Sequence, residues 1–195
     1  LTDTALLHEN DSASRLRREA GDEMEQQSQQ LIRQYGTIEP GMVVYTSAGK
    51  LSFEALIHTV AAEGEGDDVR NQLQQSISRS LMLCETNAWR SIAFPALGVI
   101  ENDIPVELCA QAFFRAITSF WDARYECAVE KIILCLDDQH FRLFFDAFRE
   151  DAIEPETASV TPVTQETESE NVGYVDLEQE DLDNLDDDEI AGWFK

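Results

Sequence analysis

Basic residues are scarce in this sequence. Its 195 residues include 14 Lys and Arg against 39 Asp and Glu, so the formal net charge is −25 at pH 7. A surface with this balance repels the phosphates of nucleic acids and the anionic headgroups of membranes. We therefore expect no direct nucleic-acid binding and no membrane partner, whereas a small anion held by backbone amides is compatible with the composition.

Several features that would identify a chemical site are also missing. No apolar run approaches the roughly 18 residues of a membrane-spanning helix. No histidine pair has metal-ligand spacing, and no serine has an identifiable base partner. We expect His58 to be structural and His8 and His140 to be solvated. The sequence therefore predicts no metal, no cofactor and no catalytic residue, and a protein that is not an enzyme.

The cysteines lack the CxxC spacing of a redox or zinc motif. All four fall within apolar helix or strand patterns: Cys84, Cys109, Cys127 and Cys135. Such positions are typical of buried free thiols in a reducing compartment. We therefore expect an intracellular protein, nuclear or cytoplasmic. Since the chain begins with Leu rather than Met, we also expect it to be a piece of a longer protein.

Acidic residues, by contrast, are abundant and unevenly placed. Residues 151–195 contain 15 acidic residues and one basic residue, and "ETASVTPVTQETESEN" within them has no period. Such composition is typical of a disordered, self-repelling linker. We therefore predict an α/β domain over residues 1–150 and a largely disordered acidic tail over 151–195. Apolar residues return at 172–194, including Trp193 and Phe194. They predict either a segment that binds a basic protein partner or a tail that packs on its own domain or has no such role.

The first 150 residues alternate between helical and strand patterns. Apolar residues at 3–4 spacing predict a helix over 12–35 that Ser12 caps and Gly36 ends. Asp138 is expected to cap the last helix, whose Phe stripe is expected to be core. The remaining elements are strands over 42–46, 53–60, 91–94 and 129–136 and helices over 68–87 and 105–124. Apolar strands between helices predict an α/β fold, a three-layer α/β/α sandwich with a mixed sheet.

Two loops of this fold have the layout of a ligand site. Ligands of open α/β sheets bind beyond the carboxyl ends of the strands. The loop "ALGVIEND" follows the strand 91–94, and "LLHENDSAS" leads into the first helix. Because a helix N-terminus offers free N–H groups and partial positive charge, either loop is suited to an anion.

Four segments together resemble the macro domain family, whose members recognise ADP-ribose. They are "ASRLRREAG", "GTIEPGMVVYTSAGKL", "FEALIHTV" and "SIAFPALG", and they occur in the family's order over roughly residues 1–149. The resemblance implies that the strands preceding the family's Asn-rich segment are missing here, so an N-terminal truncation is expected. It also implies family-equivalent ligand positions, which are Asp3, His8, Asn10, Asp11, Ser12, Ala13, Ala96, Gly98, Val99, Ile100, Glu101 and Asn102.

The sequence departs from the family at its two phosphate-binding loops. The first loop reads Glu9-Asn10-Asp11-Ser12 without glycine, and Ile100 replaces a glycine of the second. Glycines let backbone amides approach a diphosphate, whereas a β-branched residue resists a positive φ. We therefore expect a degenerate, non-catalytic interaction module of a larger protein that binds ADP-ribose or ADP-ribosylated protein weakly. The alternatives are a functional ADP-ribose reader and, third, an ADP-ribosyl hydrolase.

Overall fold

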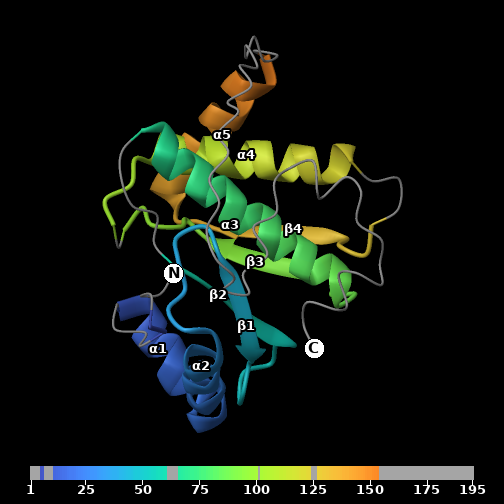
Figure 1. Cartoon of the computed structure of the whole chain (residues 1–195). Helices are drawn as coiled ribbons and strands as arrows, with labels where there is room; N and C mark the ends of the chain where they lie inside the picture. The colour runs from blue at the N-terminus through green and yellow to red at the C-terminus, as the bar shows by residue number, and fades with distance from the viewer. Residues whose placement is uncertain (1–4, 7–10, 61–65, 101, 124–126, 154–195) are drawn as a thin grey trace, which may run out of the picture. The chain divides into compact units, whose positions relative to one another are not determined.

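The computed structural model describes residues 5–6, 11–60, 66–100, 102–123 and 127–153 (Figure 1). From residue 43 onward its elements alternate along the chain as predicted, with small shifts of their ends. In order they are α1 (Asp11–Ala20), α2 (Asp22–Tyr35), β1 (Val43–Ser47), β2 (Ala55–Thr59), α3 (Asp67–Thr86), β3 (Ser91–Pro95), α4 (Val106–Asp122), β4 (Lys131–Cys135) and α5 (Asp138–Ile153).

The first predicted helix is two helices, which corrects the prediction of one helix over 12–35. Gly21 separates them with a φ of +85°, a conformation that favours glycine. The turn is fixed from outside, because the Lys50 amide donates to the carbonyl of Ala20 at 2.9 Å. Gly36 ends α2 as predicted, and its amide donates to the carbonyl of Ile32. The apolar spacing continues across Gly21, so periodicity alone does not detect the break.

The four strands form two pairs in the described part of the chain. β1 and β2 are antiparallel, with Val43 opposite Thr59, and β3 and β4 are parallel, with Ser91 opposite Lys131. Both orientations of a mixed sheet are therefore present, but no ladder joins the two pairs among these residues. Instead α3 contacts both β1 and β3 and spans the two pairs (Figure 1).

The main core lies between the β3–β4 pair and the helices α3, α4 and α5. Phe113 of α4 is its centre, fully buried between the rings of Phe94 on β3 and Phe144 on α5. Leu73, Ile77 and Leu81 supply the buried stripe of α3, and each is at most 1% exposed. A smaller cluster of Leu6, Ile38 and Val60 lies near β1.

The last helix differs from its prediction in three ways. Its cap is Asp137 rather than Asp138, because an Asp137 carboxylate oxygen accepts the His140 amide at 2.8 Å. His140 is half-buried rather than solvated, and its ring nitrogen contacts the same carboxylate. Only part of the Phe stripe is core: Phe144 is buried, whereas the stacked pair Phe141 and Phe145 is 59% and 57% exposed. The helix packs against α4, so only one side of the stripe is covered.

The described residues end with α5 at Ile153, three residues beyond the predicted end of the α/β domain. Contacts divide the chain into two units, residues 1–153 and 154–195. Residues 151–153 of the predicted disordered tail are therefore helical, whereas the rest of it, including the 172–194 segment, lies outside the described residues. Among the helices that the structure describes, none is long and apolar enough to cross a membrane.

Candidate functional site

The turn after β3 is the better defined of the two candidate loops. Gly98 is buried and has a φ of +74°, which an L side chain rarely adopts. Its carbonyl accepts two backbone amides, from Asn102 at 3.0 Å and from Ile104 at 3.1 Å. The Val99 amide donates to the Ala96 carbonyl at 3.3 Å. Three amides of this loop are therefore already hydrogen-bonded within it.

The described side chains of the same turn include no cationic group that could bind a phosphate. Ile100 is 72% exposed and does not adopt a positive φ. Val99 is half-buried against the main core, and Asn102 is exposed. Asp103 has a φ of +52° and an exposed carboxylate. The turn thus exposes an apolar side chain and a carboxylate, whereas a phosphate ligand needs backbone amides that point towards it.

The first loop is described only where it enters α1. Ala13 is buried in that helix, as expected for the small residue at the family's helix start. The helix begins at Asp11, so Ser12 lies inside it and is not the predicted cap. Asp3, His8 and Asn10 lie outside the described residues, as does Glu101 of the second loop. The structure therefore places Ala13 and turn residues 96–100 and 102, and among these described residues no contact joins the two loops.

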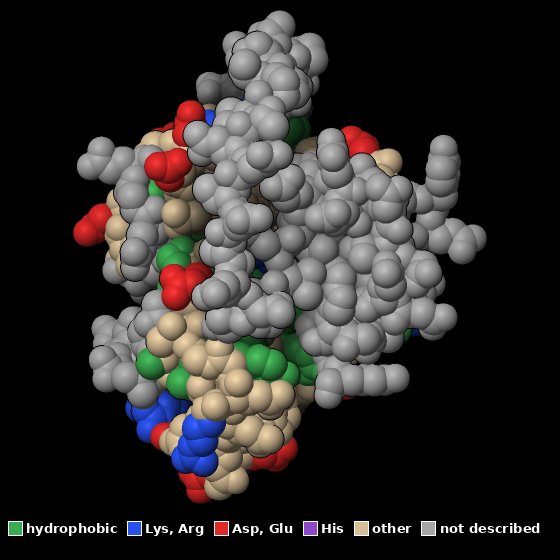
Figure 2. All heavy atoms as spheres, viewed as in Figure 1, with side chains coloured by type: hydrophobic (Ala, Val, Ile, Leu, Met, Phe, Trp, Pro, Cys, Tyr) green, Lys and Arg blue, Asp and Glu red, His purple; other side chains and the backbone are tan. Residues whose placement is uncertain are grey.

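A pocket that sequence reasoning missed lies at the junction of α1 and α2. It has a volume of about 350 Å³ and is lined by Ser14, Arg17, Arg18, Gly21, Asp22 and Glu25. Lys and Arg side chains gather over this end of the molecule, with acidic side chains beside them (Figure 2). The pattern "RLRREAGDEME" is its sequence signal, and none of the family-equivalent ligand positions that the structure describes lines the pocket.

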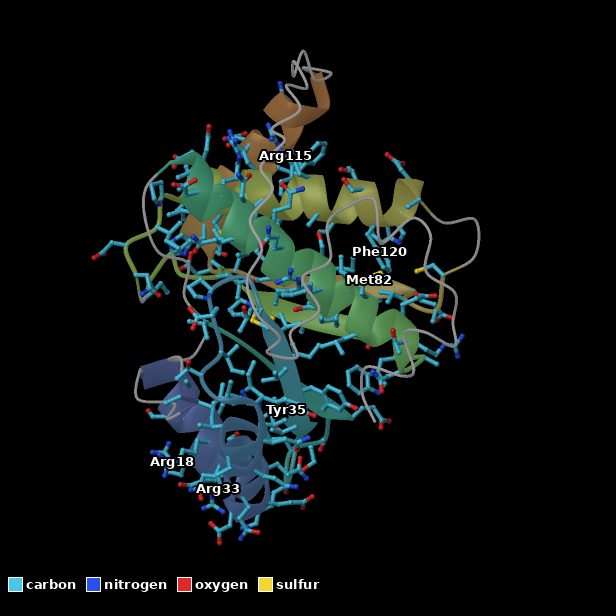
Figure 3. The ribbon with its side chains drawn as sticks, viewed as in Figure 1. Arg18, Arg33, Tyr35, Met82, Arg115 and Phe120 are labelled. Atoms are coloured by element: carbon cyan, nitrogen blue, oxygen red, sulfur yellow. The ribbon has the colours of Figure 1, made fainter. Side chains whose placement is uncertain are left out.

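The charges of this pocket compensate one another. The Arg17 guanidinium forms an ion pair with Glu25, and Arg18 lies 3.7 Å from a carboxylate oxygen of Glu19. Arg18 and Arg33 project from α1 and α2 into solvent, away from the strands (Figure 3). With carboxylates already beside its arginines, the pocket is poorly suited to an anion.

The described histidines and thiols have structural surroundings. His58 is buried, and its Nε2 lies 2.9 Å from the hydroxyl of Thr46, which supports the structural role predicted for it. Burial raises the pKa of Cys84 to about 11 and that of Cys109 to about 12, so both thiols are protonated at neutral pH. Cys127 is half-buried, and Cys135 is exposed, which corrects its predicted burial. No cluster suited to a metal ion occurs among the residues the structure describes.

Comparison with known sequences points to one family. A macro domain model matches residues 2–113. The O-acetyl-ADP-ribose deacetylase of Klebsiella pneumoniae (strain 342) is 33% identical over 126 residues, which are 64% of this chain and 71% of that protein. The protein of the same name from Salmonella typhimurium (strain LT2) is 35% identical over 117 residues, which are 58% of this chain and 65% of that protein.

Solved structures agree with the sequence match. The Oceanobacillus iheyensis macrodomain with ADP superimposes with a TM-score of 0.68 at 19% identity, covering 78% of this chain and 82% of that one. The macro domain of ganglioside induced differentiation associated protein 2 gives a TM-score of 0.66 at 18% identity, covering 74% and 71%. At these identities the likeness shows the fold, an α/β fold of the predicted class.

Proposed function

This chain belongs to the macro domain family, and from that premise we propose that it is a non-catalytic interaction module with a degenerate ADP-ribose site. The proposal treats the chain as part of a larger protein, in which it contacts other proteins rather than turning over a nucleotide. ADP-ribose or an ADP-ribosylated protein is then a weak ligand at most.

The observation that carries this proposal is that three backbone amides of the turn after β3 donate hydrogen bonds to carbonyls of the same turn. A phosphate site needs backbone N–H groups that point at the anion. In this turn the amides of Val99, Asn102 and Ile104 donate to carbonyls of the turn itself. A diphosphate that used these three amides would have to replace their internal bonds first. The exposed Ile100 side chain stands where the family has a glycine, so close approach is also blocked.

The negative charge of both loops also disfavours the binding of a diphosphate. By sequence, carboxylates flank both loops, at Glu9, Asp11, Glu101 and Asp103. A unit-charge repulsion at 4 Å costs about 1–4 kcal/mol near a protein surface, before salt screening. Two or three such repulsions cost about 2–12 kcal/mol, which is comparable to the roughly 8 kcal/mol of a micromolar complex. Because salt screens this repulsion, any remaining affinity for ADP-ribose should increase with salt concentration. At an ordinary anion site the affinity decreases with salt.

Isothermal titration calorimetry of the full chain with ADP-ribose tests the proposal. We expect no saturable binding below about 1 mM. Replacing Val99 by Thr and Ile100 by Gly, together with Gly at Glu9, Asn10 and Asp11, should restore measurable affinity. A dissociation constant in the low micromolar range for the unmodified chain would show that the loops rearrange, and the reader function would replace the proposed one.

A second candidate function follows from the relatives. The Klebsiella and Salmonella proteins are named as O-acetyl-ADP-ribose deacetylases, at 33% and 35% identity. Acetate release from O-acetyl-ADP-ribose, followed by mass spectrometry, tests that activity directly. We expect no release above the rate in buffer alone. If the unmodified chain releases acetate and the Ile100→Asp variant does not, catalysis takes place at this turn and the non-catalytic assignment is refuted.

A further inference from the structure

One face of the β3–β4 pair is open to solvent. Alternate residues of both strands are exposed, and the register places them directly opposite one another, as Ser91 with Lys131, Ala93 with Ile133 and Pro95 with Cys135. The intervening residues, Ile92 and Phe94 on β3 and Ile132 and Leu134 on β4, contact the main core. The pair therefore has one buried face and one exposed face.

An open face is unusual for parallel strands. Parallel strands occur almost only in sheets that are covered on both faces, because their crossover helices pack there. Here α3, α4 and α5 share a single core with the buried face, which contains Phe94, Phe113 and Phe144. The exposed face instead presents the apolar side chains of Ala93 and Ile133 at its centre, and the Ile133 side chain is 39% exposed. Because helices normally cover both faces of parallel strands, the exposed apolar residues of this face are a candidate site of association.

The charges around the face indicate what would cover it. Because the strands are parallel, their carboxyl ends meet at one edge, and the loops that follow both place acidic residues there. Asp103 follows β3, and Asp137 and Asp138 follow β4, all three exposed. Lys131 is the one cation among the six exposed face residues. Since the whole chain carries −25, a second copy would meet repulsion, and a basic partner would be attracted.

We propose that the exposed β3–β4 face binds an amphipathic helix of a partner protein, with an apolar stripe over Ala93 and Ile133 and basic residues at the Asp103–Asp138 edge. A helix is the element that covers parallel strands in α/β folds. Its apolar stripe packs on the exposed strand residues, and its Lys or Arg residues meet the acidic edge. This goes beyond the proposed function, because docking here does not depend on whether the turn after β3 binds ADP-ribose.

A labelled 18-residue helical peptide of Leu and Lys is the probe, and fluorescence anisotropy with the full chain is the measurement. We expect saturable binding that weakens at least tenfold in Ile133→Asp. The matched control is Phe53→Asp, which adds the same charge at a residue that is 64% exposed and lies outside the face. The control should change the affinity less than twofold. A peptide of Leu and Glu with the same pattern should not bind.

A second variant protects the test against misfolding. Ala93→Lys, on the neighbouring strand, places a cation beside the bound stripe and should also weaken binding at least tenfold, with an unchanged circular dichroism spectrum. Equal loss in Ile133→Asp and Phe53→Asp, or no binding of the Leu–Lys peptide to the unmodified chain, overturns the proposal. So does a dimer in analytical ultracentrifugation that Ile133→Asp dissociates, because a second copy would then occupy the face.

Discussion

Truncating Phe113 to alanine tests whether β3, α4 and α5 share one core. The ring is fully buried, with its centroid 5.3 Å from that of Phe94 and 5.9 Å from that of Phe144. Loss of a buried Phe side chain costs about 3–5 kcal/mol, through lost transfer free energy and the cavity left behind. The two ring contacts place this residue towards the upper end of that range, since each aromatic pair adds about 0.5–1.5 kcal/mol.

The loss is large compared with the whole stability of a domain, which is about 5–15 kcal/mol. Urea unfolding followed by Trp fluorescence gives the free energy of unfolding, and Trp89 and Trp121 are the reporters within the described residues. The matched control is Phe53→Ala, because that ring is 64% exposed and should cost less than about 1 kcal/mol. If Phe113→Ala and Phe53→Ala lower the free energy of unfolding equally, the shared core is wrong.

Three further results are expected. Gly49 and Gly66 both have a φ of +58°, but a Cβ at Gly49 would lie 2.2 Å from the carbonyl oxygen of the last residue of α1, whereas nothing lies within 4 Å at Gly66. Gly49→Ala should therefore lower the melting temperature clearly more than Gly66→Ala, and equal shifts would exclude the close approach. Iodoacetamide at pH 7.5 should label Cys135 and spare Cys84 and Cys109, as read by peptide mass spectrometry; uniform labelling would contradict their burial. Burial raises the pKa of Cys109 from 9.0 to about 12, so the unfolded chain releases that proton first. The contribution of Cys109 to stability is fully present below about pH 9 and should fall by about 1.4 kcal/mol per pH unit above it, so Cys109→Ala should reduce the slope measured by urea unfolding at pH 8–10.5.

The elements of this fold were predictable from apolar spacing, and their junctions were not. The strand "SIAF" was predicted from a short apolar run and the stripe of α3 from 3–4 spacing, because burial selects apolar residues at these positions. Gly21 breaks a helix whose apolar spacing continues through it, and the reason is an external contact, the Lys50 amide on the carbonyl of Ala20. Long-range contacts of this kind leave no local pattern in the sequence.

Burial of individual side chains was harder to predict than the identity of an element. Phe141 and Phe145 fit the same helical stripe as Phe144, yet they are exposed because the packing of α5 against α4 covers one side of the stripe. Cys135 lies in an apolar strand, yet it is exposed because the β3–β4 pair is covered on one face. In both cases the local pattern predicts which residues share a face, and the neighbouring elements decide which face is covered.

The turn after β3 shows how far the sequence carries a functional argument. Ile100 in place of a glycine predicts that the turn binds a diphosphate poorly, but it gives no magnitude. The structure adds three internal hydrogen bonds, from the amides of Val99, Asn102 and Ile104. Replacing a hydrogen bond of this kind costs about 1 kcal/mol net, so opening all three costs about 3 kcal/mol. Since 1.4 kcal/mol is a factor of ten, this term alone weakens a micromolar site to about the 0.1 mM range. Charge repulsion from the flanking carboxylates would act in addition, so under the proposed function we expect an ADP-ribose dissociation constant near or above the millimolar range.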